Sequence, residues 1–153
     1  MPISVASPAN RPGLATALAA VVRAALAIEG RRPGQIAIVL THDAELRDLN
    51  RRWRGIDRAT DVLSFPYTRD DRSVDGDLVI SLDRLAAQAK RYRVTAGKEL
   101  ARLVVHGTLH LCGLDHHREA ERRQMRRREA AAMRACAVRV AAIDRALGRV
   151  RHG

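Results

Sequence analysis

Apolar residues recur at intervals of three and four in several segments of this chain, which is the spacing of one buried helix face. In the first such segment, residues 14–27, the predicted buried stripe consists of Leu14, Leu18, Val21, Val22, Ala25 and Leu26. The same spacing predicts further helices over residues 43–53, 83–92, 96–112 and, as one long helix or two, 119–147. Asp43 is the expected N-cap of its helix, because a short polar side chain can accept a hydrogen bond from the first turn.

Runs rich in β-branched residues predict strands over residues 35–40, 62–67 and 78–81. The polar segment 68–75 is expected to be a hairpin-like loop, and an N-terminal run at Ile3-Ser4-Val5 is soon interrupted by serine and proline. Strands followed by helices favour an α+β fold, with a small mixed sheet of about four strands packed with five to six helices. The chain shows no internal repeats, so we expect one domain, residues 1–153.

Composition makes the chain strongly basic. Its net charge is +11, with 28 Lys and Arg against 17 Asp and Glu, and eleven of the arginines follow His117. We therefore expect a basic helical extension over about residues 118–153, which is either a nucleic-acid contact or an ordinary solvated helix face. Two cysteines are too few for a disulfide framework and fit a reducing cytoplasm. Arg23 interrupts the longest apolar run, so a soluble protein without membrane contact is expected.

Four of the six histidines fall within residues 106–117, at the end of a predicted helix. The helix that Thr95 would cap places His106 and His110 one turn apart on the same face. Gly113 is the expected helix stop, and the chain reversal there can bring His116 back as a third ligand. Three neutral imidazoles leave the fourth position of a tetrahedral zinc to water, as in catalytic sites. The sequence thus predicts one Zn²⁺ ion, held by a helix that crosses the sheet.

The residues next to these histidines bear on which reaction the metal site could catalyse. The spacing of the three rings is also that of metzincin proteases, which carry Glu directly after the first His as general base. This chain has Gly107 there, so a peptidase mechanism would lack its proton acceptor. Cys112 is expected to be a small apolar residue rather than a fourth ligand, and His117 a bystander or a support for a ligand.

Three blocks of sequence resemble one known family. The residues His106-Gly107-Thr108-Leu109-His110-Leu111-Cys112-Gly113-Leu114-Asp115-His116, together with the segments 54–66 (RGIDRATDVLSFP) and 76–80 (GDLVI), are similar to the YbeY family of bacterial endoribonucleases. The resemblance covers roughly residues 35–130. It implies a cytoplasmic, metal-dependent ribonuclease acting on single-stranded RNA, in 3′-end maturation of small-subunit ribosomal RNA and in ribosome quality control. The ribosome or its small subunit would be the partner.

By this resemblance the zinc ligands fall on His106, His110 and His116, and the family's functional arginine falls on Arg54. Arg54 is expected to pair with a nonbridging phosphate oxygen through two hydrogen bonds. Asp115 is the nearest carboxylate and is expected to hold a ligand ring, although capping of the helix end explains it equally well. The chain departs from the family in three places: Ala59 replaces a usual proline, the family's N-terminal strand is poorly represented at Ile3-Ser4-Val5, and the chain is basic where many relatives are acidic.

Other residues have plainer interpretations. Asp57 and Asp61, which flank the Arg54 loop, are expected to cap it. Trp53 and Tyr92 are expected to pack in the core rather than stack on bases, and Ser64 is not expected to be a nucleophile. Two other functions stay open: a metalloprotease-like hydrolase that uses the same three histidines, and a ribosome-associated RNA-binding protein with a structural zinc.

Overall fold

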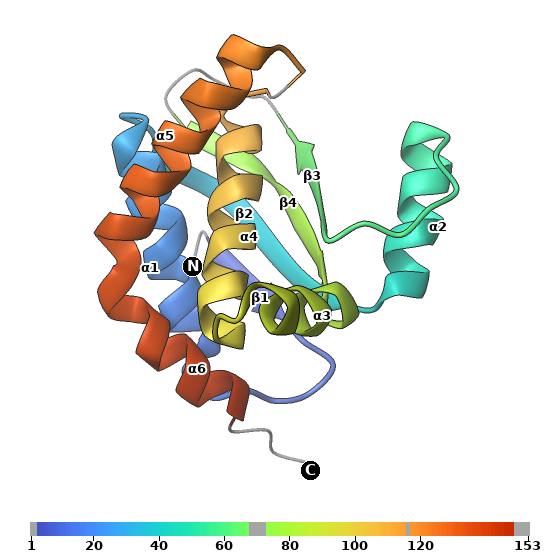
Figure 1. The fold of residues 1–153 in the computed structure, drawn as a ribbon, viewed down its shortest axis with the longest axis vertical. Helices are drawn as coiled ribbons and strands as arrows, with labels where there is room; N and C mark the ends of the chain where they lie inside the picture. Colours follow the sequence, from blue (N-terminus) through green and yellow to red (C-terminus); the bar gives the residue numbers. More distant parts are fainter. Residues whose placement is uncertain (1–2, 68–72, 116, 149–153) are drawn as a thin grey trace.

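The computed structural model describes residues 3–67, 73–115 and 117–148, and Figure 1 shows their arrangement around one sheet. The described elements comprise four strands, six α-helices and one 3₁₀ turn. In chain order they are β1 (Ile3–Ala6), α1 (Leu14–Ile28), β2 (Arg32–Thr41), α2 (Asp43–Arg54), β3 (Val62–Pro66), β4 (Ser73–Ser81), α3 (Leu82–Tyr92), α4 (Ala96–Leu111), α5 (Glu119–Cys136), the 3₁₀ turn η1 (Ala137–Arg139) and α6 (Val140–Gly148).

The sheet is mixed. Its strand order is β1-β2-β4-β3, with β1, β2 and β4 parallel and β3 antiparallel to β4. The α+β prediction is confirmed. The strands differ from the prediction in their extent. The N-terminal run forms β1, because it pairs with residues 36–39 of β2. β2 is longer than predicted at both ends, β3 ends one residue earlier, and β4 begins at Ser73, inside the predicted loop. Residues 68–72 of that loop lie outside the described residues.

Side chains alternate between the two faces of the sheet and supply two separate cores. On one face, Ile36, Ile38 and Leu78 join the main core with residues of α1, α4, α5 and α6. On the other face, Val79 and Leu63 pack with Leu46 of α2 in a smaller cluster. In Figure 1 α4 runs across the sheet between α1 and α3, while α2 lies beyond β3. The predicted central position of the histidine helix is confirmed.

The ends of α4 are those that its sequence predicts. The Thr95 hydroxyl accepts a hydrogen bond from the Lys98 N–H at 3.1 Å, and Gly113 follows the helix with a φ of 95°.

The prediction that Asp43 is an N-cap is wrong, because the N-cap of α2 is His42 and Asp43 is the first helical residue. The Asp43 carboxylate instead accepts hydrogen bonds from Ser81 at 2.6 Å and from Arg84 at 3.3 Å.

The two large aromatics that were expected in the core are exposed. Trp53 is 71% exposed and Tyr92 53%. Both lie at the C-terminal ends of their helices, beyond the buried residues of α2 and α3. Their rings are therefore not covered by another part of the fold. Within the described ranges, no helix combines the length and the apolar character that a membrane crossing requires.

Candidate active site

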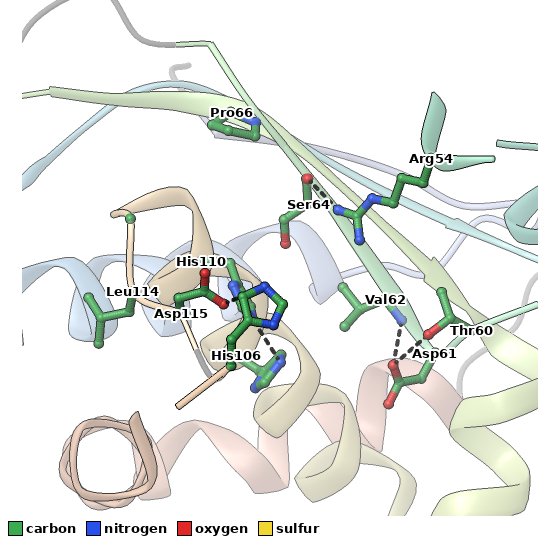
Figure 2. A pocket seen from close by; sticks show the side chains of 12 residues that line it. Arg54, Thr60, Asp61, Val62, Ser64, Pro66, His106, His110, Leu114 and Asp115 are labelled. Carbon is green, nitrogen blue, oxygen red and sulfur yellow. Dashed lines mark hydrogen bonds and ion pairs between the residues drawn. The ribbon is translucent and has the colours of Figure 1, made fainter. Parts of the chain in front are cut away.

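His106 and His110 point their rings toward one another on one side of α4 (Figure 2). Their ring centroids are 4.7 Å apart with planes at 69°, and their Nε2 atoms are 3.1 Å apart. Two nitrogens bound to one tetrahedral zinc at about 2.0–2.1 Å lie about 3.3 Å apart. The two rings therefore have the separation that a shared cation requires.

Burial of α4 explains why this pair faces outward. Between Glu99 and Leu111 every residue is buried except Arg102, His106 and His110, which follow one another at four-residue intervals. The sheet and the surrounding helices cover the rest of the helix surface. The apolar sequence of α4 thus leaves one narrow row open, and the two histidines occupy its C-terminal half.

The two histidines of this row face a cavity of about 590 Å³. The opposite wall is β3 with Arg54 and Asp61, and the loop after α4 closes one end with Gly113 and Asp115. Four of the five predicted site residues line it: Arg54, His106, His110 and Asp115. The fifth, His116, lies outside the described residues.

Glu129 is a residue of this site that the sequence prediction missed. Its carboxylate, on α5, contacts Nδ1 of His106. A carboxylate accepts hydrogen bonds, so Nδ1 carries the proton and the lone pair of His106 is on Nε2, facing His110. A signal did exist in the sequence: Glu129 falls at helical spacing on the stripe of buried residues Met125, Ala132 and Cys136 of α5, where an acidic side chain needs a partner.

Arg54 reaches the cavity from the last turn of α2. Gly55 ends this helix with a φ of 69°, and the Arg54 Nη2 donates to the backbone carbonyl of Ser64 at 3.2 Å. The guanidinium carbon lies 6.0 Å from the centre of the Phe65 ring. In the part of the chain that the structure describes, no carboxylate forms an ion pair with Arg54, so its charge is available to a bound anion.

The acidic residues near the site differ in position. Asp115 lines the cavity and lies 3.2 Å from Nε2 of His117. Asp61 accepts a hydrogen bond from the Val62 N–H at 2.8 Å, in agreement with its expected capping role. Asp57 does not line the cavity. Two hydrogen bonds from Arg47, at 2.7 and 3.1 Å, hold the pKa of the Asp57 carboxyl below its usual range.

Close packing accounts for Gly107, where a protease would carry Glu. A Cβ at this position would lie 2.8 Å from a methyl group of Leu78 and 3.3 Å from the Ser64 hydroxyl. Ser64 itself donates to the Gly107 carbonyl at 3.3 Å, which fits the prediction that it is not a nucleophile. Position 107 is therefore contact surface between α4 and the sheet, and the helix could not approach so closely with a larger residue there.

The Cys112 thiol is half-buried beside the main core, and burial raises its pKa to about 11. This fits the apolar role expected for it, because metal ligation requires the thiolate. Across the described residues, which leave out His116, no group of three or more His, Cys, Asp or Glu side chains is arranged to hold a metal ion. The described part of the predicted set is thus the His106 and His110 pair.

Comparisons with known proteins agree with the resemblance seen in the sequence. Residues 9–137 match the family model described as endoribonuclease YbeY. The endoribonuclease YbeY of an Anaeromyxobacter species is 50% identical over 112 residues, which cover 72% of this chain and 58% of that protein. The Anaeromyxobacter dehalogenans protein of the same name is 45% identical, with 77% of this chain and 62% of that protein covered.

A third relative, the endoribonuclease YbeY of Desulfitobacterium hafniense, is 44% identical, over 65% of this chain and 69% of that protein. The match spans less than two thirds of the length of the first two relatives. The solution structure of a Thermotoga maritima protein shares the fold, with a TM-score of 0.57 and 24% identity over 89% of this chain and 92% of that one. The chain belongs to the YbeY family.

Proposed function

We propose that this protein is a zinc-dependent endoribonuclease that hydrolyses phosphodiester bonds in single-stranded RNA. One observation carries the proposal: His106 and His110 converge, in one cavity, opposite an arginine that has no carboxylate partner among the described residues. The match to relatives named endoribonuclease supports the same reaction. We further propose that the substrate is small-subunit ribosomal RNA, cut in 3′-end maturation and in ribosome quality control.

His106, His110 and His116 would hold the zinc ion. The distance between the first two Nε2 atoms, 3.1 Å, supports this set, and so does the tautomer that Glu129 imposes on His106. When bound, zinc supplies Lewis-acid chemistry, since it lowers the pKa of water and polarises a phosphoryl oxygen. The ion would leave one tetrahedral position for solvent or substrate, as in other three-ligand sites.

The chain's own residues would bind and orient the phosphodiester. Arg54 can direct its N–H groups to a nonbridging oxygen, because a guanidinium fits such oxygens with two parallel hydrogen bonds. Asp115 would orient an imidazole, since its carboxylate lines the same cavity as His106 and His110. Neutralising the charge that develops on the phosphoryl oxygens is usually the largest single contribution that such a site makes to the rate.

The basic character of the chain supports RNA as the substrate class. A net charge of +11 attracts a polyanion, and arginine is the residue best suited to phosphate. We propose that residues 1–153 act as one catalytic domain in the cytoplasm, with the small ribosomal subunit as partner. Residues beyond 118 contribute to this domain directly, since α5 packs on α1 and α4 and supplies Glu129.

A substrate comparison tests the proposed reaction. Purified protein is incubated with a single-stranded RNA and with casein, each with and without a metal chelator. We expect the RNA to be cut, the casein to stay intact, and the chelator to stop the cutting. Digestion of casein would favour the metalloprotease-like hydrolase. RNA that is bound but never cut would favour a ribosome-associated binding protein with a structural zinc, and either result would contradict the proposal.

Reversing the charge of Arg54 separates phosphate binding from metal binding. Arg54→Glu is expected to lower the cleavage rate about 100- to 1000-fold, the usual effect of removing one group that stabilises the transition-state charge. Zinc content should be unchanged, because Arg54 contacts the Ser64 carbonyl and neither histidine. Arg91→Glu, an exposed position on α3, is the control for the charge change and should cut normally. Loss of zinc in Arg54→Glu would mean that Arg54 has a folding role instead.

A further inference from the structure

A second cavity, of about 500 Å³, adjoins the histidine cavity between α2 and β3. The two cavities share Arg54, Thr60 and Val62 as lining residues, so these three residues separate two neighbouring spaces. Three arginines line the second cavity, Arg54, Arg58 and Arg84, and none of its lining residues is acidic. It is therefore more uniformly positive than the histidine cavity, whose lining includes Asp61 and Asp115.

The two additional arginines are held in place through their surroundings. The loop that carries Arg58 is fixed to α2, because the Asn50 amide donates to the Arg58 carbonyl at 3.0 Å and Arg47 pairs with Asp57. Arg84 is held through its Nε, 3.3 Å from Asp43, which leaves its two terminal nitrogens for another partner. Among the described residues, no carboxylate forms an ion pair with Arg58.

The wall of this cavity also contains a buried polar side chain, Asn50. It lines this cavity and is only 5% exposed, yet its amide oxygen is buried without a hydrogen-bond partner in the described part of the chain. A buried acceptor without a donor is destabilising, and such groups are rare in folded proteins.

We propose that the second cavity binds a nucleotide of the same RNA strand, next to the phosphodiester held at the histidines. Arg58 and Arg84 bind its phosphate, and its sugar or base lies against the wall that Asn50 helps to form. Arg54, which belongs to both cavities, places the two phosphates in sequence along the strand. This inference rests on the proposed function, because it assumes that RNA is the ligand of the first cavity.

The salt dependence of RNA binding tests this subsite without any cleavage. A fluorescent single-stranded RNA of ten nucleotides is titrated with chelator-treated protein at several salt concentrations. Each arginine that neutralises a phosphate contributes about 0.7 to the slope of log affinity against log salt. Arg58→Ala and Arg84→Ala should each lower the slope by that amount, and Arg91→Ala, which removes the same charge elsewhere, should not. Thermal unfolding checks that each variant is folded. Arg58→Ala is a stricter test than Arg84→Ala, because it breaks no ion pair among the described residues.

Cleavage of two substrate lengths then locates the contact. The Arg58→Ala, Arg84→Ala double variant should have a KM for the ten-nucleotide RNA raised about tenfold or more, as expected for two lost phosphate contacts. It should cut a dinucleotide as the parent does, because a single phosphodiester cannot reach both cavities. Unchanged slopes, or equal losses on both substrates, would overturn the subsite. A parent that binds RNA but never cuts it would refute the proposed function alone, since the binding slopes still decide the subsite.

Discussion

Replacing His110 with alanine is expected to abolish both zinc binding and RNA cleavage, with a rate loss of at least about 1000-fold. The Nε2 atom of His110 lies 3.1 Å from that of His106, so the substitution removes one of two donors that face a common point. A zinc site with two remaining protein ligands would lose its ion on dialysis. Metal analysis and RNA cleavage, measured on the same dialysed preparation, check both losses.

His42→Ala is the matched control, because His42 is an exposed histidine that pairs with Asp83 away from the cavity. It should retain the zinc and the cleavage rate of the parent. If His110→Ala cuts RNA as fast as the parent, the histidine pair is not the reaction centre. If it loses its fold along with the metal, a milder change, His110→Asn, keeps the test informative through the same two measurements.

Replacing Glu129 with alanine is expected to weaken zinc binding about 10- to 100-fold, the usual cost of removing a carboxylate that orients a ligating imidazole. Glu129 contacts Nδ1 of His106 and thereby keeps the lone pair on Nε2, which faces His110. Glu129→Gln still offers an acceptor oxygen and should recover part of the affinity. Competition with a chelator of known affinity measures the zinc dissociation constant of each variant.

The control for this series is Glu119→Gln, a change in an exposed residue of α5 that pairs with Arg123. It should bind zinc as the parent does. A merely structural role for Glu129 would lower the unfolding temperature and leave the zinc affinity of the folded protein unchanged. That result, or equal affinities for Glu129→Ala and the parent, would remove Glu129 from the site.

The helix that carries His106 and His110 could be predicted from local features of the sequence. The apolar spacing of α4, the Thr95 cap and the Gly113 stop each act within a few residues, so both ends of the helix could be predicted. His106 and His110 lie on the same face of α4 because residues four apart are about one helical turn apart. The approach of Arg54 could be anticipated only through the family resemblance, because α2 and α4 are separated by two strands and a third helix.

Features that depend on contacts between residues far apart in the sequence could not be predicted. β1 is a strand because β2 lies beside it, and β4 starts at Ser73 because Ser73 and Val74 pair with the first two residues of β2. The contact between Glu129 and His106 joins two helices that only the tertiary packing brings together. The exposure of Trp53 has the same origin, since the length of α2 that the sheet covers is set by the fold and not by the apolar pattern alone.

Restoring zinc to the stripped protein is the most direct test of the central claim. Chelator-treated protein is titrated with zinc, and bound metal and RNA cleavage are followed together. We predict that cleavage is absent at the start, rises in proportion to bound zinc and stops rising at one ion per chain. Cleavage by the zinc-free protein, or full zinc occupancy without any cleavage, would contradict an account in which the three histidines hold the reacting ion.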